Sequence, residues 1–509
     1  MKIIESIVSG EIRTPDQLQR AKVQLCKDYA LEELLTNSEI LAACPENLRQ
    51  AVLPTLRKKP TRTLSGVAVL AVMTEPTPCP HGKCRYCPGG VEFGTPQSYT
   101  GREPAALRAM EHDYDPYTQT SARLGQLTAT GHSVDKVDVI VMGGSFTALN
   151  PEYREWFVKR CLDAMNGEES ENLQEAQQLN ESAPSRCIGL TIETRPDIFR
   201  EEEAVHSMYL GATRVELGVQ TTRDDVLHRV NRGHGVAETI AATRLAKDSG
   251  LKVCYHMMLG LPGADLEADI ESFHEIFNNS DYKPDMLKIY PTLVVEDTDL
   301  YKMWKAGEYV PYRDEEVAEL LARIKRDIPR WVRIQRVQRD IPAPLIIDGV
   351  RKGDIRLHAQ RILEERGEQC NCIRCREIGR MDINAKNDEV NLELVREEYE
   401  ASGGTEIFLS FLEIESGGIA AYARLRKSNG NARIRELKVL GEVVPIDNPS
   451  GGRWQHKGLG RDLVNECERI TSCEWGFNEI SVTSGVGARP YYRKIGYSLE
   501  LPYMVKRTT

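Results

Sequence analysis

Six short runs rich in valine, isoleucine and leucine do most to limit what this chain can fold into. They occupy residues 67–73, 137–142, 188–193, 214–219, 252–257 and 286–290. Helical stretches of about 15 residues or more separate them, which is the pattern of repeated βα units around a buried parallel sheet. Residues 331–338 are a candidate for one further strand. The pattern therefore predicts an α/β fold.

The sequence on either side of these runs has a different texture. Residues 1–64 show helical spacing and end in a basic run at 57–62, while an antiparallel α+β pattern begins near residue 390. A chain of 509 residues is long enough for two to four domains. We predict a helical extension at 1–64, a domain of repeated βα units at 65–322, a basic, cysteine-rich linker at 323–389 and an α+β domain at 390–509. The polar insert 167–184 is expected to be a surface excursion.

Composition excludes several classes of protein. With 41% hydrophobic and 28% charged residues, the chain is too apolar for general disorder. Its longest uninterrupted apolar stretch, residues 67–73, is far too short to span a bilayer, and we expect a cytoplasmic protein. The net charge of −10 argues against a generally polycationic nucleic-acid binder but leaves room for local basic patches.

Cys79, Cys84 and Cys87 form the first of two tight groups among the thirteen cysteines. Cytosolic thiols are kept reduced, so clustered cysteines in such a chain indicate metal binding. A closed zinc site needs four ligands, and His81 would have to complete it. A [4Fe–4S] cluster held by three thiolates instead keeps one iron free. The loop therefore favours an iron–sulfur cluster, while the scattered cysteines are expected to be packing residues.

Cys370, Cys372 and Cys375 form the second group. These three thiolates and a fourth ligand would complete a structural zinc site. His358 is the nearest histidine and the candidate for that ligand, although it could equally be a surface residue of its helix. A second iron–sulfur cluster is the alternative.

The loop CPHGKCRYCPGG and the following TPQSYTGREPAALRA resemble the Elp3 family, in its short-spaced archaeal or bacterial form. Four residues separate the first two cysteines, where the usual radical S-adenosylmethionine (SAM) spacing has three. The resemblance continues through VMGGSFTALNPEYR, IGLTIETRPD, NRGHGV and QHKGLG. It implies a partial (βα)6 radical-SAM barrel with a helical N-terminal extension, a metal-binding linker and a C-terminal α+β GNAT domain. It also implies a [4Fe–4S] cluster, SAM and acetyl-CoA.

Several residues at the ends of the predicted strands are candidates for binding SAM. Glycines after a strand let the backbone approach a ligand, and the resemblance identifies the pair at 143–144 as the turn that meets the amino-acid part of SAM. Charged and amide side chains follow the next two strands, where the functional groups of a barrel gather. Ion pairs between neighbouring loops are the alternative for these residues. The candidates are Gly143, Gly144, Glu193, Arg195, Glu216 and Gln220.

The C-terminal part carries a pattern that resembles the acetyl-CoA loop of GNAT acetyltransferases. A glycine-rich turn opening a helix offers free amides to a pyrophosphate, and the residues concerned are Gln455, Gly458, Leu459, Gly460 and Arg461. The resemblance implies that acetyl-CoA contacts the backbone of Glu436, Leu437, Lys438 and Val439.

The resemblance also implies one contact to the acetyl-CoA thioester and one from the barrel side. Tyr492 is expected to approach the thioester sulfur, although Tyr491 and Tyr492 could also be core aromatics. Lys136 corresponds to a family lysine that contacts acetyl-CoA from the barrel, although a lysine at such a turn is more often only solvated.

Residues 323–339 carry seven basic residues against one acid, with Trp331 among the arginines. Although such runs are usually solvated faces, this one joins two candidate active sites. We therefore predict a cleft for an RNA phosphate backbone, which the run at 57–62 would extend.

The family resemblance implies that the chain forms 5-carboxymethyluridine at wobble uridine 34, in the anticodon stem-loop of tRNA. A 5′-deoxyadenosyl radical would take hydrogen from the acetyl methyl, the carbon radical would add to C5, and thioester hydrolysis would release CoA. One alternative is a protein-lysine acetyltransferase with an inert barrel, and another is a non-catalytic tRNA-binding or assembly protein. A homodimer and Elongator-type partners stay open, and no membrane partner is expected.

Overall fold

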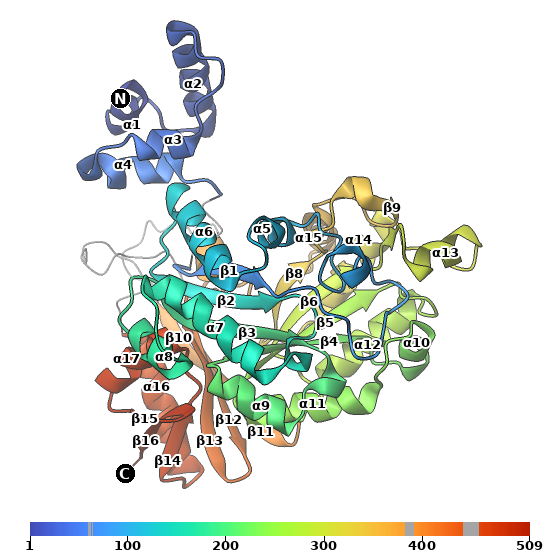
Figure 1. Cartoon of the computed structure of the whole chain (residues 1–509). Helices are drawn as coiled ribbons and strands as arrows, with labels where there is room; N and C mark the ends of the chain where they lie inside the picture. The colour runs from blue at the N-terminus through green and yellow to red at the C-terminus, as the bar shows by residue number, and fades with distance from the viewer. Residues whose placement is uncertain (60–62, 64, 382–390, 441–457, 509) are drawn as a thin grey trace.

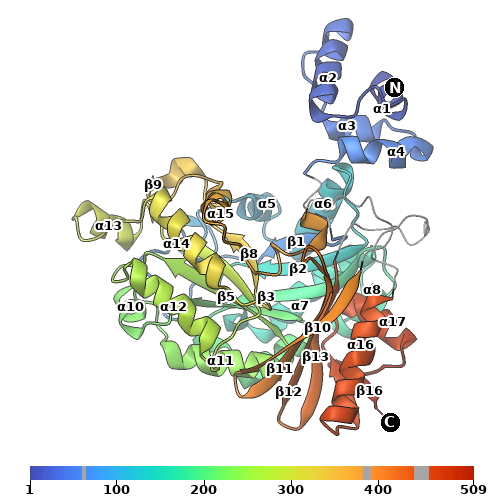
Figure 2. The ribbon, with the colours of Figure 1, turned by 180° about the vertical axis from the view of Figure 1, so that it is seen from behind.

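Two seven-stranded sheets and a set of N-terminal helices make up the computed structural model (Figure 1). It describes residues 1–59, 63, 65–381, 391–440 and 458–508. The N-terminal helices stand away from the two sheets in both views (Figure 1, Figure 2). Among the described residues no helix is both long and apolar enough to cross a membrane.

The first sheet is parallel and open, with the strand order β1-β2-β3-β4-β5-β6-β8. Its ends, β1 and β8, do not pair, so the barrel is partial, as predicted. The further strand expected at 331–338 is β8, and the barrel sheet therefore extends beyond residue 322. The strands are β1 Ala68–Met73, β2 Lys136–Met142, β3 Arg186–Thr194, β4 Arg214–Gln220, β5 Lys252–Leu259, β6 Met286–Pro291 and β8 Arg333–Val337.

Helices join these strands and cover the convex face of the sheet (Figure 1). Alternate residues of β2 explain this arrangement: Val137, Val139 and Val141 are buried against the helices, whereas Lys136 and Asp138 face the hollow and are only half-buried. The helices are α5 Pro104–Glu111, α6 Pro116–Ala129, α7 Pro151–Asn166, α8 Leu173–Asn180, α9 Glu201–Tyr209, α10 Asp224–Arg229, α11 Val236–Asp248, α12 Leu266–Asn278, α13 Asp299–Lys305, α14 Asp314–Asp327 and α15 Ile355–Glu365, with a small pair of strands β7 Val294–Val295 and β9 Ile346–Asp348.

The N-terminal helices have a small apolar core of their own. Thr14 and Thr36 each form a capping box, which satisfies free amides at the start of a helix. The Arg57 guanidinium donates to the carbonyl of Gly131 at 2.9 Å and ties this part to the end of α6. The helices are α1 Lys2–Val8, α2 Pro15–Tyr29, α3 Asn37–Ala42 and α4 Glu46–Leu56.

The second sheet forms the α+β domain expected at the C-terminus, with the order β10-β11-β12-β13-β14-β16-β15. Arg435 has no partner in the register between β12 and β13 and is therefore a bulge. Strand β13 pairs with β14 only before this bulge, at Arg433 and Ile434. The elements are β10 Leu392–Ala401, β11 Gly404–Glu413, β12 Ile419–Ser428, β13 Asn431–Val439, α16 Leu459–Arg469, β14 Glu479–Val482, α17 Arg489–Lys494, β15 Ser498–Glu500 and β16 Tyr503–Arg507.

A buried ion network joins the second sheet to the barrel. Arg435 binds Asp285, which directly precedes β6, with nitrogen–oxygen distances of 2.7 and 2.8 Å, and Glu406 at 2.9 Å. Arg426 binds Asp248 at the end of α11 through two nitrogens, one at 3.1 Å. Because such pairs need close and fixed geometry in a dry interior, the network holds the two sheets in one arrangement.

The insert 167–184 differs from the surface excursion predicted for it. It contains helix α8, in which Leu173 and Ala176 are buried. Its Gln177 accepts a hydrogen bond from Arg489 at 3.2 Å, and Glu181 pairs with Arg493. The insert therefore contributes to the contact between the barrel and the C-terminal domain.

The basic stretch 323–339 does not offer the free cationic cleft predicted from its sequence. Most of its cations are paired within the chain, three of them with carboxylates distant in sequence and two with neighbouring aspartates. The pairs are Arg323–Glu267, Arg326–Asp327, Arg330–Glu397, Arg333–Glu377 and Arg336–Asp340, and buried Lys325 binds Gln360. Trp331 stacks on Tyr399 with ring centroids 4.0 Å apart and is not presented to a base. In the run 57–62, residues 60–62 lie outside the described residues.

Candidate active site

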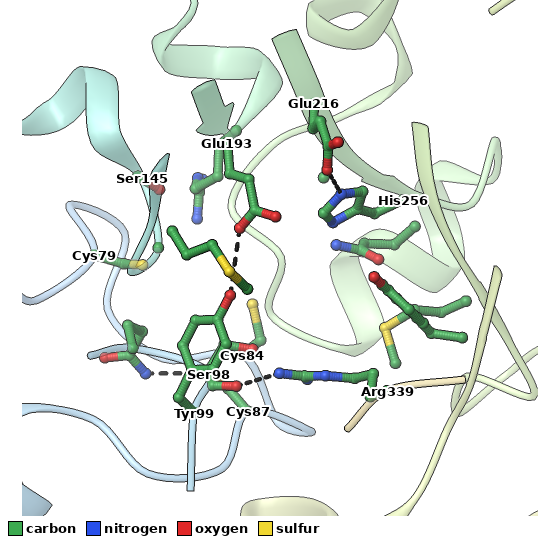
Figure 3. A pocket seen from close by; sticks show the side chains of 18 of the residues that line it. Cys79, Cys84, Cys87, Ser98, Tyr99, Ser145, Glu193, Glu216, His256 and Arg339 are labelled. Atoms are coloured by element: carbon green, nitrogen blue, oxygen red, sulfur yellow. Dashed lines mark hydrogen bonds and ion pairs between the residues drawn. The ribbon is translucent and has the colours of Figure 1, made fainter. Parts of the chain in front are cut away.

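A pocket lies at the carboxyl ends of the barrel strands, beneath the loop that follows β1 (Figure 3). Cys79, Cys84 and Cys87 line it, together with Gly144 and Glu193 from the ends of β2 and β3. Parallel strands deliver their following loops to one edge of the sheet, which explains why residues so distant in sequence meet here.

The three thiols of this loop are spaced for a cluster rather than for a single ion. Among the described residues, Cys370, Cys372 and Cys375 bring three ligand atoms within 4.8 Å of one another, but the three cysteines of the loop do not. Zinc–sulfur bonds of about 2.3 Å would draw thiolates to roughly 4 Å from one another. The wider triad fits a multi-iron core with one ligand position open.

A buried cation supports the fit of an anionic cluster at these thiols. Arg232 is 8% exposed, and its Nη1 lies 3.6 Å from Sγ of Cys84. Burial alone would lower the pKa of Arg232. Tyr86 and the cysteine thiols outweigh burial and raise this pKa, and no carboxylate is among the described groups that do so. A buried charge without a counter-ion is costly. A thiolate-bound cluster would supply the missing negative charge.

The predicted glycine turn lies between the cysteine loop and β2. Gly143 has φ of +124°, and a Cβ built on it would come within 2.2 Å of Oγ1 of Thr74. Gly144 has φ of +110° and lines the pocket. Only glycine fits this approach without strain, so the backbone is left open toward the pocket.

Replacing Gly143 by alanine is expected to lower the free energy of unfolding by roughly 1–3 kcal/mol, because the backbone conformation disfavours a Cβ and Thr74 is buried. Thermal unfolding measures the change. Gly125→Ala is the matched control, because no atom lies within 4 Å of its Cβ position and its φ lies outside the left-handed region. Equal melting temperatures for Gly143→Ala and the wild type would contradict the expectation.

A chain of charges runs across the interior face of the barrel. Nζ of Lys288 lies 3.1 Å from Glu193 and also pairs with Glu216, while Nε2 of His256 lies 2.7 Å from Glu216. The Tyr99 hydroxyl donates to Glu193 at 3.3 Å. Figure 3 shows the Glu193 side chain between the cysteine loop and His256, and the Glu216 carboxylate bonded to His256. Burial alone would raise the pKa of Glu216. Lys288 and His256 outweigh burial and hold this pKa well below its ordinary range, so Glu216 stays ionised.

Two further predicted residues line the pocket with unsatisfied polar atoms. Arg195 pairs with Asp197 at 2.9 Å, but its Nη1 is buried and has no hydrogen-bond partner in the structure as described. Oε1 of Gln220 is also buried without a hydrogen-bond partner in the structure as described. The backbone of Gln220 is strained, with φ of +75°. Buried polar atoms without partners indicate a polar ligand, and strain of this kind is concentrated at functional sites.

The predicted acetyl-CoA residues gather around the splayed end of β13. Glu436 to Val439 lie beyond the bulge, where β14 no longer pairs with β13. Gly458, with φ of +83°, is the N-cap of α16, and Gly460 in its first turn lies against Leu437 and Val439. Leu459 and Arg461 belong to the same turn, whereas Gln455 lies outside the described residues. A strand edge and helix amides therefore converge on one place.

The two tyrosines and Lys136 occupy different environments. Tyr492 is 6% exposed and packs in the core of the C-terminal domain, where burial raises its pKa and keeps the phenol protonated. Tyr491 is partly exposed, with its hydroxyl beside Gly460. Lys136 begins β2 and Gly143 follows it. At about 3.3 Å per residue the strand places them roughly 20 Å apart.

The second cysteine group closes tightly enough for one metal ion, because its three sulfur atoms lie within 4.8 Å of one another. His358 is not part of this group among the described residues. The structure therefore does not bring His358 to the three sulfur atoms, and its role as the fourth ligand stays a prediction.

Arg232, Gln97 and Tyr99 were not predicted from the sequence. The Gln97 amide donates to Sγ of Cys87 at 3.2 Å, and Arg232 reaches Cys84 from the loop after α10. Neither contact follows from local spacing, because both depend on how loops meet at the edge of the sheet. The available signal was the family resemblance itself, because Arg232 lies in NRGHGV and Gln97 and Tyr99 lie in TPQSYTGREPAALRA.

Three family models match this chain. The Radical SAM superfamily model covers residues 74–276, the Radical_SAM C-terminal domain covers 284–365, and the ELP3 N-terminal domain covers 1–64. Together they account for the helical extension and the barrel.

Similar proteins extend the likeness to nearly the whole chain. A tRNA uridine(34) acetyltransferase of Methanocaldococcus jannaschii is 51% identical, over 92% of this chain and 90% of the relative. Elongator complex protein 3 of Homo sapiens is 44% identical, over 99% of this chain and 96% of the relative. The solved structure of Methanocaldococcus infernus Elp3 with an N-terminal deletion has a TM-score of 0.77 and 45% identity, covering 87% of this chain and 100% of that one.

Proposed function

The chain belongs to the Elp3 family and is a tRNA uridine(34) acetyltransferase with a radical-SAM domain, and we propose that it makes 5-carboxymethyluridine from acetyl-CoA. The proposal depends on two sites in one molecule. One is the cluster pocket at the carboxyl ends of the barrel strands. The other is the splayed edge of β13, which we propose binds acetyl-CoA.

The position of the β13 edge against the barrel carries this proposal. Burial lowers the pKa of Lys252, at the start of β5, to about 8, while the Glu436 carboxylate partly opposes the shift. Asp138 on β2 acts on the same lysine. Glu436 at the β13 edge therefore lies near Lys252 of β5 and Asp138 of β2, the strand that begins with Lys136 and leads to the glycine turn of the cluster pocket. This arrangement favours one reaction that uses both sites over acetyl transfer with an inert barrel.

Each group has a role in this proposal. When bound, the cluster and SAM supply radical chemistry. The Gly143–Gly144 backbone, Arg195 and Gln220 would hold the amino-acid part of SAM. The fixed charges of Glu193 and Glu216 would orient the rest of it, because they are already held in place before it binds.

The residues around α16 and the β13 edge would bind acetyl-CoA. The amides at the start of α16 would bind its phosphates, and the β13 backbone would bind its pantetheine. Tyr492 would donate a proton toward the thioester sulfur, because its phenol stays protonated. Lys136 would contact acetyl-CoA from the barrel side.

The test is mass spectrometry of tRNA nucleosides after anaerobic reconstitution with SAM, acetyl-CoA, a low-potential reductant and tRNA. We expect 5-carboxymethyluridine with the wild type and none with Cys84→Ala, which should still bind acetyl-CoA. Absence of the product with an intact cluster would overturn the proposal. A protein-lysine acetyltransferase would instead modify a peptide and survive Cys79→Ala.

We also propose that Cys370, Cys372 and Cys375 hold a structural zinc ion. Elemental analysis is expected to give about one zinc per chain, and Cys372→Ser should lose the zinc and lower the melting temperature. Cys467→Ser is the control, because Cys467 is equally buried but packs in the C-terminal core. Iron in place of zinc, or zinc retained by Cys372→Ser, would contradict this assignment.

We propose that tRNA contacts the helical extension 1–64 as well as the rim of the pocket. Arg339 supports the second contact, because it lines the pocket and donates to the carbonyl of Ser98 rather than to a carboxylate. A guanidinium held in this way keeps its charge available for a phosphate.

A further inference from the structure

We propose that Arg232 is the counter-ion that sets the reduction potential of the iron–sulfur cluster. It favours the reduced state, which forms when the oxidised cluster accepts one electron from a low-potential donor. The inference rests on the cluster that the radical-SAM family requires and is independent of the acetyl-CoA and tRNA parts of the proposed function.

The side chain of Arg232 is fixed on all sides. Its Nη2 donates to the carbonyl of Gly218 on β4 at 2.6 Å, and its Nε donates to Nε2 of His234 at 3.1 Å. His234 can accept this bond because it is neutral: burial, followed by the charge of Arg232, lowers its pKa to about 4. The remaining nitrogen, Nη1, is directed at Sγ of Cys84.

The other cations near the thiols have different anchors. Arg195 is bound to Asp197 through two nitrogens, each at 2.9 Å, so its charge is already compensated. Arg339 is held by the carbonyl of Ser98 at the rim. Among the described residues near the cluster loop, Arg232 thus combines burial with the lack of a carboxylate partner.

The charge of the site gives the direction of the effect. Three thiolates leave an oxidised [4Fe–4S]2+ core with a net charge of about −1, and a one-electron reduction makes it about −2. A fixed positive charge in a medium of low dielectric stabilises the second state more than the first. The Gln97 amide, which donates to Cys87 at 3.2 Å, acts in the same direction but without a full charge.

The test is a redox titration of the reconstituted protein without tRNA or acetyl-CoA, followed by electron paramagnetic resonance. Arg232→Gln is expected to lower the equilibrium constant for reduction at least tenfold, which is about 59 mV for one electron. Arg232→Lys keeps the charge and should stay much closer to the wild type. Arg229→Gln removes an exposed cation three residues earlier in the chain and should leave the potential unchanged.

A wild-type potential in Arg232→Gln with the cluster fully loaded would overturn the proposal. Weaker binding of SAM in equilibrium dialysis, found together with that unchanged potential, would make Arg232 a ligand-binding residue instead.

Cluster-free protein keeps the proposal testable if Arg232→Gln fails to assemble a cluster. Without the cluster the charge of Arg232 is uncompensated, so Arg232→Gln should then melt at a higher temperature than cluster-free wild type, and Arg232→Lys should not. A lower melting temperature for cluster-free Arg232→Gln would contradict the role of a counter-ion.

Discussion

Replacing Asp285 by alanine is expected to lower the free energy of unfolding by about 3–5 kcal/mol, because it leaves buried cations without their shared counter-ion. The carboxylate binds Arg435 through both oxygens, at 2.7 and 2.8 Å, and lies 3.5 Å from Arg424 and 3.8 Å from Lys247. It also accepts the amide of Val253 at 2.8 Å, so the loss reaches the start of β5. The variant should therefore loosen the contact between the two sheets.

Chemical denaturation measures this loss, and hydrogen exchange locates it at the junction of β13 and β6. The control is Glu319→Ala, which breaks an ion pair with Arg366 that is half-exposed on both sides and should change the unfolding midpoint little. Equal stability of Asp285→Ala and wild type would show that the network does not hold the sheets together.

The same carboxylate predicts the direction of the pH dependence. Burial alone would raise the pKa of Asp285. Arg435, Lys247 and Arg424 outweigh burial and hold this pKa well below the ordinary 3.8. A pKa depressed in the folded state gives stability that is present above the unfolded pKa and is lost as the pH falls below it. The wild type should therefore lose stability below about pH 4, and Asp285→Ala should lose less over that range.

The regular parts of the fold could be predicted from sequence because they follow local periodicity. Runs such as 137–142 alternate or are wholly apolar, and each became a strand of the parallel sheet. Pairing between distant charges has no such local signature. The arginines at 323–336 looked like a free basic surface, but Glu267, Glu377 and Glu397 fold against them from other elements.

In the candidate site, too, the features with a local sequence pattern could be predicted and the contacts between distant residues could not. The cysteine spacing and the glycine turn are local patterns, and the sequence was sufficient to predict where they lie. His358 is the nearest histidine in sequence, yet it does not join the three sulfur atoms in the structure. Arg232 reaches the cysteine loop from a distant part of the chain, and Gln97 folds back on Cys87 from ten residues farther along, so only the folded structure shows their role.

Replacing Lys288 by methionine is expected to reduce formation of the modified uridine roughly 100-fold, because misplacing the groups that hold a reactant has effects of that size. Lys288 joins Glu193 to Glu216 in the pocket, and its ammonium holds the two carboxylates side by side and keeps Glu216 ionised. Methionine fills a similar volume without the charge, so the two carboxylates repel each other. The pKa of Glu216 should then rise, and the affinity for SAM should fall.

Three measurements separate this effect from general damage. Iron content should stay at the wild-type value, because Lys288 does not belong to the cysteine loop. SAM affinity, measured by calorimetry, should fall together with the rate of product formation. Lys302→Met is the matched control: it removes an exposed ammonium paired with Asp299 on α13 and should leave both quantities unchanged. A Lys288→Met variant with full cluster content and a rate within about threefold of wild type would show that Glu193 and Glu216 keep their places without the lysine.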